Sequence, residues 1–382
     1  MNFPGRHRIL ALFFGSIFAL LILWPGHCPA RAAEPSRRFL YVAAPGVRDY
    51  LEYGGHGVLV FDIDHDHKFV KRIAARGVDE KGKPLNVKGI CASAAQHRFY
   101  VSTLRFLTCF DLETDQILWE KAYDGGCDRM AISPDGKIIY LPSLEGPHWH
   151  VIDALSGEII KKLVPNSGAH NTLYSQDGGH AYLAGLKSPI LRVTDTRIHD
   201  VSLEVGPFSN VVRPFTINRA ATLCFVNVNE RLGFEAGDLK TGKVLCAVTV
   251  GNFQKGPVKR HGCPSHGIGL TPDENELWVC DATNQRLHIF DVRGFSAADP
   301  KPPREFATLV VRDEPGWVTF SIDGKYAYPS TGEVIDVKTR GVVATLKDEK
   351  MTEVQSEKMV EIDFAGGKPV RAGDQFGVGR RN

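Results

Sequence analysis

Short runs of alternating apolar and polar residues follow one another from about residue 38 to the C-terminus. The stretches "CDRMAISPDGKIIYLPS" (127–143) and "SHGIGLTPDENELWVCD" (265–281) have the same order of elements. Each begins with a polar or charged residue, continues with an alternating run and a Pro-Asp turn, and ends in a second apolar run. Alternation with a period of two, with turn-forming residues at the joints, predicts short antiparallel β-strands.

An aromatic residue in the second run of each unit shows that the unit is repeated. Successive aromatics are 59, 40, 42, 43, 53 and 50 residues apart. They are Tyr41, Tyr100, Tyr140, Tyr182, Phe225, Trp278 and Tyr328. Units of 40–50 residues built from short strands are typical of a β-propeller. The sequence therefore predicts an all-β fold, a seven-bladed β-propeller with four antiparallel strands per blade.

A third run in each unit ends on an aspartate just before a tight turn, which gives an independent count of seven. These aspartates are Asp62, Asp111, Asp153, Asp195, Asp238, Asp291 and Asp336. A carboxylate at this position can accept hydrogen bonds from backbone N–H groups two residues later, as in an Asx-turn. We therefore interpret them as structural residues and not as catalytic ones.

The first unit lacks an innermost strand, and the C-terminal tail offers one. In "EKMVEIDFAGG" the apolar residues Val360, Ile362 and Phe364 alternate before the turn at Gly366, and Lys358 stands at the start. Pairing of this segment with the first unit would close the ring and remove an exposed sheet edge. No linker or charge block divides the mature chain, so residues 36–382 are predicted to form a single seven-bladed β-propeller domain closed by the C-terminal tail.

The N-terminus predicts export. Arg6 and Arg8 precede an apolar run, and the small residues around Arg31 suit signal peptidase, so residues 1–32 are predicted to be a signal peptide cut after Ala32. An uncleaved membrane anchor is the alternative. With cleavage the mature protein is periplasmic or secreted, has no membrane segment and is expected to be a monomer.

Charge and cysteine content narrow the function classes. The net charge is +2 for the whole chain and −1 after removal of three signal-peptide arginines, so no nucleic-acid partner is expected. Seven cysteines remain in the mature chain, which leaves at least one free thiol. Several lie at apolar strand positions and are interpreted as buried small residues, although the sequence alone cannot pair any disulfide.

Polar residues twelve positions before the aromatics are predicted to form a ring. They begin the innermost strands, which converge on the central channel of a propeller. The ring consists of Lys88, Asp128, His170, Arg213, His266 and Gly316, with Lys358 added by the tail; Trp317 follows Gly316. The mainly basic ring predicts a small anionic ligand, or an acidic segment of a protein partner, bound through charge-assisted hydrogen bonds. Solvated polar side chains in a channel need no ligand, so that interpretation also stays open.

A metal site is a weaker possibility. "HGCPSHG" places His261, Cys263 and His266 close together, which can suit zinc or copper. No second cluster reinforces them, and we predict no metal there. The chain has no CxxCH, GxSxG or GxxxxGK[ST] motif, so haem attachment, an α/β-hydrolase nucleophile and a phosphate-binding loop are not indicated.

The repeats resemble those of the YVTN-type, YncE-like family of exported seven-bladed β-propellers. The resemblance rests on "GCDRMAISPDGKIIYLPS", "GAHNTLYSQDGGHAYLAG", "PSHGIGLTPDENELWVCD" and "GWVTFSIDGKYAYPST", and it covers nearly all of the mature chain. It implies the architecture but no catalytic residue, since fold does not give function.

Two hypotheses follow for function. The first is an exported binding protein that holds a small anion at the top of its channel through Lys88, Arg213, Lys358, His170 and His266, with Asp128 orienting one of them. The second is a periplasmic redox or cofactor-associated enzyme or accessory protein that uses the channel histidines. The sequence names no cofactor and does not decide whether a reaction is catalysed.

Overall fold

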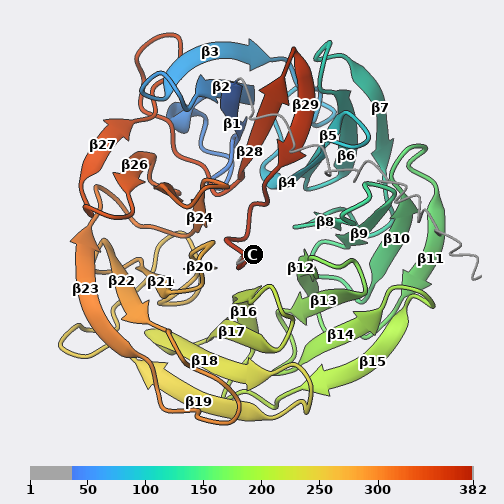
Figure 1. The fold of residues 1–382 in the computed structure, drawn as a ribbon. Helices are drawn as coiled ribbons and strands as arrows, with labels where there is room; N and C mark the ends of the chain where they lie inside the picture. The colour runs from blue at the N-terminus through green and yellow to red at the C-terminus, as the bar shows by residue number, and fades with distance from the viewer. Residues whose placement is uncertain (1–36, 381–382) are drawn as a thin grey trace, which may run out of the picture. The chain divides into compact units, whose positions relative to one another are not determined.

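Seven β-sheets stand around a central channel in the computed structural model, which describes residues 37–380 (Figure 1). The predicted signal peptide lies outside these residues. Each sheet is a blade of antiparallel strands, and the all-β, seven-bladed prediction is confirmed for the described part of the chain. Among the same residues there is no helix that is both long enough and apolar enough to cross a membrane.

The strands occur in chain order, blade by blade. The first blade contains β1 (Arg37–Ala44), β2 (Gly57–Asp62), β3 (Lys68–Ile73), β28 (Met359–Ala365) and β29 (Lys368–Ala372), with the short 3₁₀ turn η1 (Leu51–Tyr53) after β1. Blade two contains β4 (Val87–Ser93), β5 (Arg98–Thr103), β6 (Phe106–Asp111) and β7 (Ile117–Ala122). Blade three contains β8 (Ala131–Ile132), β9 (Ile138–Pro142), β10 (Trp149–Asp153) and β11 (Ile159–Leu163). Blade four contains β12 (Ala169–Tyr174), β13 (His180–Gly185), β14 (Leu191–Asp195) and β15 (Asp200–Val205). Blade five contains β16 (Val212–Ile217), β17 (Leu223–Val228), β18 (Gly233–Asp238) and β19 (Val244–Thr249). Blade six contains β20 (Ile268–Leu270), β21 (Glu276–Asp281), β22 (Arg286–Asp291) and β23 (Arg304–Val310). Blade seven contains β24 (Val318–Phe320), β25 (Tyr326–Pro329), β26 (Glu333–Asp336) and β27 (Val342–Thr345).

The seven repeated aromatics lie in the second strand of their blades and are at most 2% exposed. They fill the space between neighbouring blades; the rings of Tyr41 in β1 and Phe99 in β5, for example, meet edge to face at 5.4 Å. Apolar residues on opposite faces of a strand thus pack against two different blades. This two-sided burial explains why the aromatic strands are more apolar than a strand with one wet face.

The seven repeated aspartates end the third strand of each blade, as predicted. Their carboxylates accept backbone hydrogen bonds from the turn that follows. In the first two blades, Asp62 Oδ1 accepts from Asp64 N at 3.1 Å and Asp111 Oδ1 from Glu113 N at 3.0 Å. Asp238 Oδ1 accepts from Lys240 N at 2.8 Å. The Asx-turn interpretation therefore holds for these residues.

The tail closes the ring. Strand β28 pairs antiparallel with β1, with Tyr41 opposite Val360 and Phe39 opposite Ile362. Strand β28 takes the place of the missing first strand, so that β28, β1, β2 and β3 form the same four-strand unit as the other blades, as the sequence predicted. Strand β29, which was not predicted, pairs with the other side of β28 and adds a fifth strand at the edge of the blade.

After β29 the chain enters the channel, and the described part of the tail runs toward the centre of the ring in Figure 1. Ile90 N donates to Gln375 Oε1 at 3.1 Å. Gly377 O accepts from Thr216 Oγ1 at 2.7 Å and from Leu270 N at 2.8 Å. Residues 373–380 therefore bond to blades on different sides of the ring and plug the channel from one face.

Candidate functional site

The innermost strands bring five of the predicted ring residues to one cavity of about 130 Å³. They are Lys88, His170, Arg213, His266 and Lys358. Lys88 lies in β4 and His170 in β12, while the other three lie at or just before the inner strands of blades five, six and one. The cavity lies at the face where the inner strands start, opposite the face that the tail enters.

The other two predicted residues lie behind the cavity wall. Asp128 is fully buried and faces Lys88, whose Nζ is 3.5 Å from Asp128 Oδ1. Trp317 is also buried, and the Arg129 guanidinium lies over its ring at 4.7 Å. The Trp317 indole N–H donates to Gln375 O of the tail. Trp317 thus packs between Arg129 and the tail segment that enters the channel. It does not line the cavity, although the sequence analysis placed it among the ligand-binding residues.

Gly316 is the ring position without a side chain, and the structure shows why. An added Cβ would lie 2.1–2.5 Å from ring atoms of His261. The imidazole of His261 occupies the space that a seventh ring side chain would take. It arrives from the segment between β19 and β20, outside the repeat register.

Two residues that sequence analysis missed connect the ring. Arg129 and Glu357 are adjacent in sequence to Asp128 and Lys358, and both line the cavity. The backbone is irregular there, since β8 begins only at Ala131 and β28 only at Met359. Strict in-and-out alternation therefore fails at these positions, and the neighbour of a ring residue also points inward. The sequence feature that could have indicated these two residues is that both are charged and directly adjacent to a predicted ring residue.

Glu357 is the centre of a buried ion-pair cluster. Its carboxylate pairs with Arg129, with Lys358 Nζ at 2.6 Å, and with His261 Nδ1 at 3.0 Å. Burial by itself would raise the pKa of Glu357, but Lys358, Arg129 and His261 outweigh it and hold the pKa well below its usual value. Glu357 is therefore anionic in the folded protein.

Hydrogen bonding fixes the protonation of His170. Arg129 Nη1 can only donate, and it lies 3.1 Å from His170 Nε2, which must accept. Nδ1 then carries the proton and donates to Asp128 Oδ2 at 2.6 Å. Burial lowers the pKa of His170 to about 4, with Asp128 offsetting only part of that effect. Burial likewise would raise the pKa of Asp128, but His170 and Lys88 hold it at about 2.

His266 is neutral too and presents a bare nitrogen. Burial lowers its pKa well below the usual value. Its Nδ1 donates to Gly316 O at 2.9 Å, so Nε2 is unprotonated. Both histidines were predicted to donate to an anion. In the structure, His170 has both nitrogens engaged and His266 offers an acceptor, so the donors at this cavity are lysine and arginine.

The basic groups outnumber the acidic ones. Six basic residues line the cavity: Arg48, Lys88, Arg129, Arg213, Arg260 and Lys358. Four acidic residues lie among or behind them: Glu145, Glu357, Asp128 and Asp313, the last paired with Arg260 at 2.8 Å. The surplus is two positive charges while all six bases are protonated.

Some of these donors have hydrogen-bonding capacity left. Within residues 37–380, the ion-pair partner of Lys88 Nζ is Asp128, at 3.5 Å. Arg213 uses Nε toward Cys263 Sγ at 3.3 Å and Nη2 toward His261 O at 2.7 Å, which leaves Nη1. Because an ion pair in water-excluded surroundings is stronger than one in solvent, unused N–H groups here favour an anion.

Of the three metal candidates from the sequence, His261 and His266 come together, and Cys263 does not join them. Cys263 Sγ lies beside Arg213 and Ser265 O, while His261 and His266 lie near Glu357 instead, with ligand atoms within 4.8 Å. Glu357 is already paired with Arg129 and Lys358, and these charges oppose a divalent cation. We therefore interpret the His261–His266–Glu357 group as part of the ion-pair cluster.

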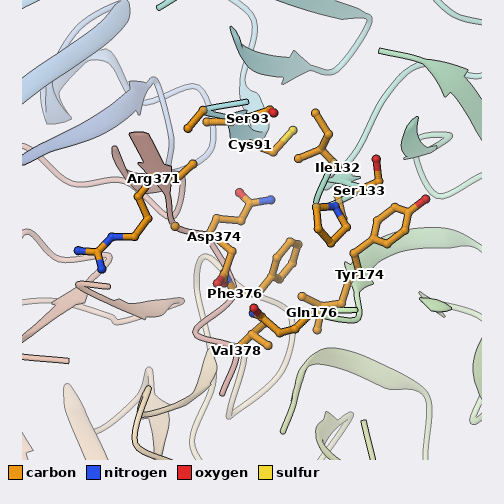
Figure 2. Close-up of a pocket in the computed structure, with 18 of the residues that line it drawn as sticks. Cys91, Ser93, Ile132, Ser133, Tyr174, Gln176, Arg371, Asp374, Phe376 and Val378 are labelled. Atoms are coloured by element: carbon orange, nitrogen blue, oxygen red, sulfur yellow. The ribbon is translucent and has the colours of Figure 1, made fainter. Parts of the chain in front are cut away.

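A second cavity, of about 330 Å³, opens on the opposite face beside the tail (Figure 2). Phe376 and Val378 of the tail line it, together with Tyr174 and Gln176. Its charged groups are paired, because Arg371 bonds Asp363 and Arg380 bonds Asp374. It presents no convergent charge, so the channel-mouth cavity is the better candidate site.

Cysteine chemistry does not contribute to the site. All seven cysteines within the described residues are free, and six of them are buried. Burial raises the pKa of Cys263, the one nearest the cavity, which keeps its thiol protonated.

The fold and the cavity define this protein as a seven-bladed β-propeller with a basic cavity at the mouth of its channel. No family model and no curated protein matches the chain. Among solved structures, the chain is similar to Kuenenia stuttgartiensis hydrazine synthase, with 15% sequence identity and a TM-score of 0.45, over 67% of this chain and 94% of that chain.

Proposed function

We propose that this propeller binds a small oxyanion, a carboxylate or a phosphate-like group, at the mouth of its central channel. The observation that supports the proposal is the surplus of basic side chains with unused N–H groups around a small cavity. Lys88 and Arg213 are the direct donors, and Lys358 adds charge. An acidic side chain of a protein partner would present the same group, so a free oxyanion tests the shared chemistry.

Asp128, His170 and Arg129 position these donors. Asp128 lies 3.5 Å from the Lys88 ammonium and accepts from His170, and His170 accepts from Arg129. These contacts hold the side chains of Lys88, His170 and Arg129 in place before a ligand binds. Preorganised donors lose less conformational entropy on binding than free side chains do.

Replacing Lys88 or Arg213 by methionine is expected to weaken sulfate binding roughly 10- to 100-fold, since a charge-assisted hydrogen bond contributes about 1.5–3 kcal/mol. Isothermal titration calorimetry of the folded protein with sodium sulfate at low ionic strength measures it. Affinity should also fall as salt is raised, because mobile ions screen the cluster.

The matched control is Lys137→Met. Lys137 is 65% exposed at the Pro-Asp turn of the opposite face, and its removal changes the net charge equally. If Lys137→Met weakens sulfate binding as much as Lys88→Met does, only general electrostatics is involved and the proposed site is wrong. The same conclusion follows if wild-type protein binds no sulfate at low salt.

Sulfate affinity is expected to fall as the pH rises from about 6 to about 8.5, on the order of tenfold, which is about 1.4 kcal/mol. Burial lowers the pKa of Lys358 to about 7, with Glu357 offsetting part of the effect and Arg129 and Lys88 adding to it. Lys358 is therefore charged below pH 7 and neutral above it. Sulfate keeps its charge throughout, so the change reports on the protein.

Calorimetry at several pH values checks this dependence, and Lys358→Met isolates the contribution of the lysine. The variant should bind sulfate weakly with a much flatter profile. A wild-type affinity that stays constant over this range would show that Lys358 does not contribute to the site.

The proposal includes export. The N-terminal pattern of residues 1–32 and the YVTN-type repeats support a signal-bearing, YncE-like propeller that works in the periplasm or outside the cell. Cell fractionation and N-terminal sequencing of the mature protein test it. A mature chain that begins near residue 33 in the periplasmic or secreted fraction supports export, and full-length protein in the cytoplasm contradicts it.

A further inference from the structure

Lys358 is an unusual lysine in its surroundings. Its side chain is 3% exposed, yet it lines the channel-mouth cavity. Nζ donates to Gly46 O at 3.0 Å and to Glu357 Oε2 at 2.6 Å. The amine is thus held at a fixed place, and the cavity is its approach for a small molecule.

The neighbours of Lys358 favour a reactive amine. Burial is the largest cause that brings the pKa of Lys358 to about 7. Arg129, which pairs with the same carboxylate, and Lys88, in the same cavity, lower the pKa further, while Glu357 opposes the change. A lysine that is desolvated beside other cations is partly neutral near pH 7, and a neutral amine is nucleophilic. Exposed lysines remain ammonium ions at this pH.

The same groups suit the product of addition to a carbonyl. A protonated imine carries a positive charge at the position of the former ammonium, and Glu357 would remain its counter-ion. Lys88 and Arg213 are the donors for an anionic group on the molecule that brings the carbonyl. A 2-oxo acid has a carboxylate next to its carbonyl carbon. Its carbonyl carbon would react with Lys358, and its carboxylate would accept hydrogen bonds from Lys88 and Arg213 in the same cavity.

We propose that Lys358 forms an imine with a small 2-oxo acid bound at the channel mouth. This rests on the proposed anion site and names its ligand class. The lone pair of Nζ forms a bond to the carbonyl carbon, and the carbonyl oxygen leaves as water with two protons. The two protons of the water come from the neutral amine, and one further proton from solvent converts the imine to its protonated form, with Glu357 as the counter-ion. The step needs no oxidant or reductant. Lys358 is the catalytic residue, and Glu357 is a positioning residue that acts through it.

The test traps the imine by reduction. Full-length mature protein is incubated with pyruvate and sodium cyanoborohydride near pH 7, digested and mapped by mass spectrometry. A single carboxyethyl group on Lys358 is expected, formed at least tenfold faster than on exposed Lys137. Acetone, which has the carbonyl but no carboxylate, should label Lys358 far more slowly. Because wild-type protein is mapped, the result does not depend on whether a variant folds.

Variants sharpen the result. Lys358→Arg keeps the charge but removes the amine, so the adduct should disappear. Lys88→Met should raise the pyruvate concentration needed for half-maximal labelling about tenfold, with Lys137→Met as the unchanged control. The positioning role of Glu357 predicts that Glu357→Gln shifts the pH at which labelling is half-maximal, and does not only lower its rate.

The two proposals fail separately. Labelling of Lys358 no faster than of Lys137, in protein that binds sulfate, overturns the imine and leaves the anion site standing. Labelling of Lys358 by acetone as fast as by pyruvate, in protein that binds no sulfate, overturns the anion site and with it the assignment of a 2-oxo acid.

Discussion

Replacement of Glu357 by glutamine is expected to lower the free energy of unfolding by about 3–5 kcal/mol. The buried groups Arg129, Lys358 and His261 all contact this one carboxylate. Glutamine keeps the shape but removes the charge, so two buried cations lose their counter-ion. Such a loss is a large part of the about 5–15 kcal/mol that holds a protein folded. Urea unfolding at pH 7, followed by tryptophan fluorescence, measures it.

The control for this change lies four residues away. Glu353 pairs with Arg312, but it is 56% exposed, so Glu353→Gln should cost no more than about 1 kcal/mol. A double variant that also replaces Arg129 by methionine should recover part of the loss, because it removes one of the uncompensated charges. Equal stability of Glu357→Gln and Glu353→Gln would show that the cluster is not what we describe.

Removal of the tail from residue 359 onward is expected to abolish cooperative folding. Met359, Val360, Ile362 and Phe364 of β28 are buried in the cores on either side of the first blade. Their burial contributes about 1.5–3 kcal/mol each, or roughly 6–12 kcal/mol together. The truncation also exposes the edge of β1, which invites aggregation. Circular dichroism during thermal unfolding checks whether a cooperative transition remains.

A shorter truncation separates closure from plugging. A chain that ends at Ala372 keeps β28 and β29 and loses only the segment that enters the channel. It should unfold cooperatively at a somewhat lower temperature, because contacts such as Gly377 O with Thr216 Oγ1 are lost. If both truncations behave alike, β28 does not close the ring in the way the structure indicates.

The repeat itself was readable in the sequence because it is set by local chemistry. The aromatics from Tyr41 to Tyr328, the aspartates that end the third strands and the alternation of Val360, Ile362 and Phe364 each depend on residues close in the chain. Strand β29 and the plug could not be predicted in this way. Their residues carry no repeat signature, and their place depends on the channel that the blades form.

Part of the candidate site could be predicted from the sequence, and part of it could not. The register of the repeat was enough to predict that Lys88, His170, Arg213, His266 and Lys358 begin the innermost strands, and the structure places all five at one cavity. Glu357 and Arg129 were missed, and His261 was considered only as a weak metal candidate. The first two lie where the backbone departs from regular strand geometry, and His261 arrives from a segment outside the repeat.

The sequence by itself determined the number of blades, the four-strand unit and the residues that begin each inner strand, because side-chain alternation and turn chemistry act over a few residues. Only the tertiary structure decided the charge and protonation of the cavity. These depend on burial and on groups more than 200 residues apart in the chain, such as Arg129 and Glu357, whose distance is set by closure of the ring. Burial lowers the pKa of His170, which is therefore neutral, and burial also lowers the pKa of Lys358.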